Sequence, residues 1–168
     1  MFKPQEKGKL QIYTGDGKGK STAAFGLAMR ATGWGGRVVI IQFQKARCCG
    51  EHESAQKLDI KIIRCSEGRG CSPCTSPCPL FCAAFEILNE GRADILILDE
   101  VMAAIRHGCV SLREALTLTE IRAENTELVM TGRNAPEELT ERADLVTEMK
   151  KIKHYYEQGL PARQGIEY

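Results

Sequence analysis

The residues best suited to chemistry form a glycine-rich run near the amino terminus, TGDGKGKST, from Thr14 to Thr22. Glycines let the backbone curl so that its N–H groups point at phosphate oxygens, and a following helix presents its positive end to the same anion. In such a loop the lysine reaches the terminal phosphates and the next hydroxyl binds Mg²⁺. The residues expected to bind phosphate are Gly15, Asp16, Gly17, Lys18, Gly19, Lys20, Ser21 and Thr22.

One position of this loop departs from the usual pattern. The pattern is a glycine, four residues, and then Gly-Lys-Ser/Thr. Counting back from Gly19 places Thr14 where the first glycine should stand. A flexible turn between a strand and a helix is the alternative interpretation. The apolar segment before the loop, the helical segment after it and the Gly-Lys-Ser-Thr ending favour phosphate binding.

A second group able to do chemistry is the acidic pair Asp99-Glu100, which follows the apolar run DILIL. Strands of open α/β sheets deliver ligand-binding residues at their carboxyl ends. An acid at such an end can hold Mg²⁺ directly or through water. The alternative is that the acid caps the next helix. Together with the phosphate loop, the pair predicts a metal role for Glu100 or Asp99.

A third group is a dense run of cysteines in an insertion-like loop at about residues 65–82. Its spacing is Cys-x₂-Cys-x₃-Cys-x₃-Cys, and if Pro79 opens a helix, the last two cysteines fall on one side of it. Four thiolates could bind zinc or a [4Fe–4S] cluster. Reduced loop cysteines or a disulfide are the alternatives. The four cysteines are Cys71, Cys74, Cys78 and Cys82.

The elements that must position these groups alternate between short apolar runs and helical segments. Runs buried on both faces are typical of parallel strands, which need helical crossovers. We expect strands over Leu10–Thr14, Arg37–Phe43, Ile60–Arg64, Asp94–Leu98, Glu127–Thr131 and Leu145–Met149. We expect helices over Lys20–Thr32, Phe81–Asn89, Val101–His107, Ser111–Ala123 and Pro136–Ala143. The alternation predicts an α/β fold with a mostly parallel sheet and helices on both faces.

The length and the charge balance narrow the class of protein further. The 168 residues fit one domain spanning 1–168. With 23 Lys and Arg against 22 Asp and Glu, the net charge is +1, which does not suit a general nucleic-acid binder. Met1–Lys9 holds no apolar run, and Val38–Ile41 is far too short to cross a membrane. We therefore expect a cytoplasmic protein with no nucleic-acid or membrane partner.

Several motifs occur in the same order in one known family. The sequence resembles the P-loop ATP:corrinoid adenosyltransferases, which act on cob(I)alamin or cob(I)yrinic acid a,c-diamide. The similarity covers residues 10–45 and 94–168. The motifs that carry it are Thr14 to Gly26, Leu98-Asp99-Glu100, Thr131-Gly132-Arg133, Ala143 to Met149, Lys153 to Gly159 and Ala162 to Tyr168.

The resemblance implies a P-loop NTPase-like, RecA-like fold and an unusual transferase reaction. A Co(I) corrinoid attacks the 5′-carbon of the ATP ribose, triphosphate leaves, and a cobalt–carbon bond forms. The substrates would be ATP and a corrinoid, with Mg²⁺ as cofactor. An electron donor would reduce cobalt beforehand, and the chain would form a homodimer.

The resemblance also implies roles for single residues. Lys20, Glu100 and Arg133 would be the catalytic residues, and Ser21 with Glu100 would hold Mg²⁺. Arg30 and Arg133 could reach phosphates, although each could also be an ordinary surface arginine. The tail segment Gln164-Gly165-Ile166 is expected either to close over the nucleotide or to be a docked chain end.

The middle of the chain departs from the family, because the aromatic pair that helps the corrinoid lose its lower axial ligand is missing near Gly70. Two other functions also remain open at this point. One is a P-loop ATPase or phosphotransferase, which would release ADP. The other is a nucleotide-binding module that senses redox state through a metal centre held by the cysteines.

Overall fold

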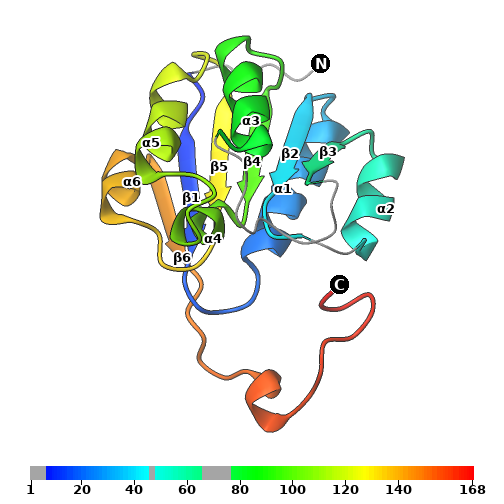
Figure 1. Ribbon diagram of the computed structural model, residues 1–168. Helices are drawn as coiled ribbons and strands as arrows, with labels where there is room; N and C mark the ends of the chain where they lie inside the picture. Colours follow the sequence, from blue (N-terminus) through cyan, green and yellow to red (C-terminus); the bar gives the residue numbers. More distant parts are fainter. Residues whose placement is uncertain (1–6, 46–47, 66–76) are drawn as a thin grey trace.

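The computed structural model describes residues 7–45, 48–65 and 77–168. In this part of the chain, a six-stranded parallel sheet has the order β3-β2-β4-β5-β1-β6 (Figure 1). The strands are β1 (Leu10–Thr14), β2 (Val38–Gln42), β3 (Lys61–Arg64), β4 (Ile95–Asp99), β5 (Glu127–Thr131) and β6 (Leu145–Glu148). The helices are α1 (Lys20–Gly33), α2 (Gly50–Lys57), α3 (Pro79–Asn89), α4 (Val101–Arg106), α5 (Leu112–Ile121), α6 (Glu137–Arg142) and the 3₁₀ turn η1 (Tyr155–Gln158).

The sheet is apolar on both faces because successive side chains of a strand point to opposite sides. Leu96 and Leu98 of β4 belong to the core beneath α3, α4, α5 and α6. Ile95 and Ile97 of the same strand belong to the core beneath α1 and α2. The predicted parallel α/β sheet with helices on both faces is confirmed, and each predicted strand lies within a few residues of its expected bounds.

The sequence did not predict the helix α2, because an amphipathic helix is found by its periodic apolar face. In GEHESAQK only Ala55 is buried, so there is no apolar stripe to detect. Cys49 caps the start of this helix: its thiol accepts the backbone N–H of His52, and the His52 ring accepts the backbone N–H of Cys49. The other ring nitrogen of His52 lies 2.7 Å from Oε1 of Gln42, the last residue of β2, and this contact holds the start of α2 beside that strand.

The strand order brings the chemical motifs to one edge of the sheet. The strand β5 lies between β1 and β4, and all three run in parallel. The phosphate loop follows β1, the acidic pair ends β4, and Gly132-Arg133 follows β5. The carboxyl ends of parallel strands are where open α/β sheets bind ligands.

The last residues form a tail that leaves β6 and carries η1. Figure 1 shows this tail running away from the sheet and then turning back, so that the chain end lies below α2 in that view. No helix among the described residues has the length and apolar character needed to cross a membrane.

Candidate functional site

The phosphate loop needs glycine at two positions where the backbone turns left-handed. Gly15 has a φ of 98° and Gly19 a φ of 121°, which residues with a Cβ rarely adopt. A Cβ at Gly15 would also lie 2.5 Å from the carbonyl oxygen of Met149. Gly17 donates its N–H to that same carbonyl at 2.6 Å. The glycines therefore let the end of β6 pack directly against the loop.

The departure at Thr14 is explained by its place in β1. Thr14 is the last residue of this strand and is not among the residues with positive φ. Its hydroxyl accepts the backbone N–H of Ala135 at 3.2 Å, and its carbonyl accepts the N–H of Met149 at 2.8 Å. The loop therefore needs no glycine here, and the threonine ties it to the segments after β5 and β6.

Lys20 begins α1 and is almost fully buried. Its Nζ donates to the carbonyl oxygen of Gly17 at 2.7 Å, so the side chain folds back over the loop. Burial lowers the pKa of Lys20, and the negative charge of Glu100 partly opposes this. A desolvated cation of this kind favours an anionic ligand, because the ligand supplies the charge that the site lacks.

Asp99 holds Ser21 in one orientation. The Asp99 carboxylate is fully buried, and its Oδ1 accepts the hydroxyls of Ser21 at 2.7 Å and Thr131 at 2.8 Å. Its Oδ2 accepts the side-chain amide of Gln42 at 3.1 Å. Because Ser21 donates its hydrogen to Asp99, the lone pairs of its oxygen stay available to a cation.

Glu100 differs from its neighbour because the chain turns between them. Glu100 has a left-handed φ of 59°, and its backbone N–H donates to the Thr131 hydroxyl at 2.9 Å. Its side chain lines the cavity at this edge of the sheet. Burial raises the pKa of Glu100, and the charge of Asp99 raises it further. The sequence could not decide which of the two acids would face a metal ion. In the structure Glu100 lines the cavity, whereas Asp99 does not line it and instead holds the Ser21 hydroxyl.

The cavity has a volume of about 680 Å³, within the range of small-molecule sites. Its walls include Asp16 to Thr22 of the loop, Glu100, Arg133 and the chain end from Gly165 to Tyr168. The structure thus brings together most of the residues that the sequence singled out. Gly15 and Arg30 do not line the cavity, and Arg30 is exposed in the last turn of α1. A phosphate contact by Arg30 stays a prediction.

Several residues that line the cavity were not predicted from the sequence, and two of them carry charges. Lys45 follows β2, Glu51 is in the first turn of α2, and their side chains form an ion pair at 3.0 Å inside the cavity wall. Burial disfavours both charges, but the hydrogen bond and attraction between them raise the pKa of Lys45 and lower that of Glu51. No sequence signal marked them, because the helix that carries Glu51 has no apolar stripe.

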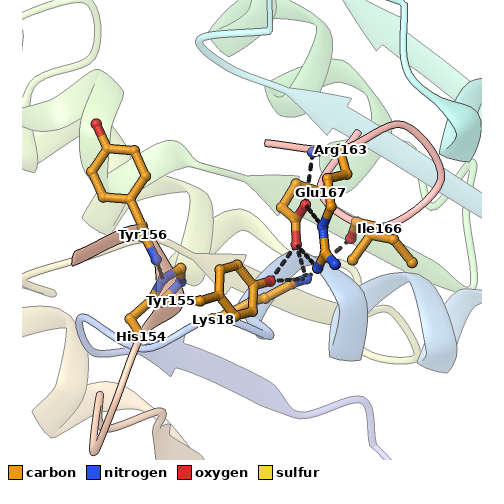
Figure 2. A network of polar contacts seen from close by, with 7 residues as sticks. All are labelled: Lys18, His154, Tyr155, Tyr156, Arg163, Ile166 and Glu167. Atoms are coloured by element: carbon orange, nitrogen blue, oxygen red, sulfur yellow. Dashed lines mark hydrogen bonds and ion pairs between the residues drawn. The ribbon is translucent and has the colours of Figure 1, made fainter. Parts of the chain in front are cut away.

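The tail lines one side of the cavity with Gly165 to Tyr168. Figure 2 shows how Lys18 of the phosphate loop contacts this tail. The ammonium of Lys18 donates to the Tyr155 hydroxyl at 3.1 Å, to the Ile166 carbonyl at 3.1 Å and to Glu167 Oε1 at 3.0 Å. Arg163 donates its backbone N–H and its guanidinium to Glu167 Oε2 at 2.8 and 3.3 Å. Hydrogen bonds from Arg163 and Tyr155 lower the pKa of Glu167. The Glu167 carboxylate therefore holds two parts of the tail together and also binds the tail to Lys18 of the phosphate loop.

Replacing Glu167 by glutamine should release the tail. The docked tail lowers the pKa of Glu167, so docking is fully stabilised above the ordinary glutamate pKa of about 4.3 and weakens as the pH falls through the lowered value. We expect the NMR signals of Tyr155 to shift at acidic pH in the wild type and at every pH in Glu167→Gln. The variant Glu157→Gln, on the same tail, should keep the wild-type signals. Identical Tyr155 signals in wild type and Glu167→Gln would contradict the docking.

The cysteine run is only partly described. Cys71 and Cys74 lie outside the described residues. Cys78 is buried just before α3, which Pro79 opens as expected, and Cys82 is partly exposed one turn into that helix. In the described ranges no three His, Cys, Asp or Glu residues gather as a metal site. Zinc or cluster binding by the four cysteines stays a prediction.

The strand order, with the phosphate loop after β1 and the acidic pair at the end of β4, defines a P-loop NTPase-like domain. The family model "ATP:corrinoid adenosyltransferase BtuR/CobO/CobP" matches residues 6–168, and the chain belongs to this family. The resemblance of the motifs is thereby confirmed, and the protein is a transferase. Membership favours neither the phosphotransferase nor the redox-sensing alternative.

Relatives from three bacteria agree with the family assignment. A corrinoid adenosyltransferase of Sinorhizobium sp. is 37% identical, over 99% of this chain and 83% of the relative. One of Pseudomonas aeruginosa is 33% identical, over 97% of this chain and 85% of the relative. One of Escherichia coli strain K12 is 30% identical, over 97% and 87%.

Proposed function

We propose that this protein transfers the 5′-deoxyadenosyl group of ATP to a Co(I) corrinoid and releases triphosphate. The observation that supports this most is that Lys20, Ser21 and Glu100 face one cavity of nucleotide size. In the reaction, an electron pair of Co(I) forms the bond to the ribose 5′-carbon. The carbon–oxygen bond breaks, and its electron pair leaves with triphosphate.

The residues of the loop suit a polyanionic leaving group. Lys20 and the backbone N–H groups of the loop would stabilise the charge that develops on triphosphate, as preorganised donors do in a partly desolvated site. Lys18 can exchange its bond with Glu167 for a phosphate oxygen. Arg133 lines the same cavity and is exposed, so its side chain can move to contact the triphosphate as it leaves.

A magnesium ion fits the donor set of this site. The Ser21 oxygen keeps its lone pairs, and the Glu100 carboxylate faces the cavity, so both offer the hard oxygen ligands that Mg²⁺ prefers. When bound, the ion would neutralise phosphate charge. Ser21 and Glu100 would hold it, and Asp99 would fix the Ser21 hydroxyl.

The family resemblance supports a homodimer and an electron donor that delivers cobalt as Co(I). The length of the chain supports one nucleotide-binding domain, and its charge and apolar pattern support a cytoplasmic location. The spacing of the four cysteines in the insertion-like segment at about 65–82, where the chain departs from the family, supports binding of zinc or a [4Fe–4S] cluster. A colourless protein that lacks zinc and iron after anaerobic purification would count against this metal centre.

Product analysis tests the proposed reaction. The purified protein is incubated anaerobically with MgATP and a chemically reduced corrinoid, and the phosphate products are separated by chromatography. Triphosphate that forms only when the corrinoid is present supports adenosyl transfer. ADP with orthophosphate, formed with or without the corrinoid, would instead indicate an ATPase.

A further inference from the structure

A chain of buried polar contacts leads from the metal-binding side of the site to a histidine outside it. Asp99 Oδ2 accepts the side-chain amide of Gln42 at 3.1 Å, and Gln42 Oε1 lies 2.7 Å from Nε2 of His52. Gln42 is only 1% exposed and Asp99 is fully buried, so neither can replace a lost partner with bulk water. His52 itself does not line the nucleotide cavity.

The hydrogen-bond donors and acceptors between Asp99 and His52 determine how the Gln42 amide is oriented. Asp99 is an acceptor, so Gln42 must turn its NH₂ group toward it and its oxygen toward His52. The histidine must then donate from Nε2. Its other nitrogen, Nδ1, accepts the backbone N–H of Cys49 at 2.8 Å and lies 3.1 Å from the carbonyl oxygen of Cys49. The contact with Gln42 therefore requires a proton on Nε2, and the start of α2 holds the ring in place.

Loss of the contact between His52 and Gln42 would also change the position of the Ser21 hydroxyl. If the His52 donor were lost, the buried oxygen of Gln42 would have no partner, and the side chain would shift toward another donor. Asp99, which accepts the Gln42 amide, would shift with it, and so would the carboxylate oxygen that accepts the Ser21 hydroxyl at 2.7 Å. The direction of the Ser21 lone pairs thus depends on a residue two hydrogen bonds beyond Asp99.

We propose that His52 is a positioning residue, which acts through Gln42 and Asp99 to aim the Ser21 hydroxyl at the cation of a bound nucleotide. The inference rests on the proposed magnesium site. It assigns a role in the site to α2, the polar helix that the sequence pattern did not reveal.

Two substitutions separate positioning from helix capping. In His52→Asn the amide oxygen can still accept the Cys49 N–H, but the side chain is too short to reach Gln42. In His52→Gln the amide reaches the place of Nε2 and can donate to Gln42. Calorimetry would measure ATP binding by the full chain, with Mg²⁺ and with EDTA. Loss of a partner that orients a metal ligand typically weakens metal affinity about 10- to 100-fold.

We expect His52→Asn to bind MgATP about tenfold more weakly than the wild type, His52→Gln to recover most of this loss, and all three proteins to bind ATP equally in EDTA. Recovery by asparagine instead of glutamine would show a capping role and overturn the proposal. If Mg²⁺ does not change ATP affinity even in the wild type, the proposed metal site fails together with this inference. If Mg²⁺ matters but His52→Asn matches the wild type, only the inference fails.

A measurement on the unaltered protein keeps the proposal testable should either variant fail to fold. In ¹⁵N-labelled protein, Nε2 of His52 should carry a proton that is hydrogen-bonded to Gln42. A ring protonated on Nδ1 alone would overturn the proposal, because Nε2 could not then donate to Gln42.

Discussion

Replacing Lys20 by methionine should lower kcat/KM for adenosyl transfer about a thousandfold. Preorganised donors aimed at developing charge are each worth roughly a hundred- to a thousandfold in rate, and Lys20 is the buried cation of the loop. Methionine has a similar length and removes the charge, so the loop should keep its packing. The rate is measured anaerobically with Co(I) corrinoid and MgATP.

The control for this variant is Lys57→Met, at the end of α2 and away from the cavity. It should leave the rate unchanged.

The thermal midpoint of Lys20→Met should not fall, because burial already lowers the pKa of this lysine and the substitution removes a desolvated charge. Turnover within tenfold of the wild type would contradict a role for Lys20 at the triphosphate.

Replacing Glu100 by glutamine should lower kcat/KM about a hundredfold and yet stabilise the free protein. Glutamine keeps the shape but not the charge that would hold Mg²⁺. Because the folded protein raises the pKa of Glu100, its charged form destabilises the fold at neutral pH. This effect shrinks once the pH falls below the raised value and is gone below the ordinary glutamate pKa of about 4.3. Urea unfolding should therefore show a gain at neutral pH that vanishes in acid.

The matched control is Glu53→Gln, an exposed acid of α2 that does not line the cavity. It should change neither the rate nor the pH dependence of unfolding. If Glu100→Gln kept wild-type turnover at low Mg²⁺ concentration, Glu100 would not hold the ion. If it destabilised the protein at neutral pH, the carboxylate would have a structural partner instead.

The sequence predicted the parts of the site that depend on local patterns. Glycines in the loop are required by left-handed backbone at Gly15 and Gly19, and such requirements leave a readable motif. The apolar run before Asp99 marked the strand. The pattern could not separate Asp99 from Glu100, because their roles depend on a left-handed turn at Glu100 that no glycine signals.

The parts that the sequence could not predict depend on long-range contacts between polar groups. The pair Lys45–Glu51 and the ring of His52 sit on or beside a helix with no apolar stripe. The tail motif was recognised by resemblance, but its bond from Glu167 to Lys18 joins residues at opposite ends of the chain. Hydrophobic periodicity carries no information about such pairs.

The fate of the ribose 5′-carbon tests the central claim most directly. ATP labelled with ¹³C at that position is incubated anaerobically with the protein and a Co(I) corrinoid, and the label is followed by NMR. Adenosyl transfer predicts a signal from carbon bound to cobalt that grows in step with intact triphosphate. A label that stays in a nucleoside phosphate while ADP accumulates would contradict the account.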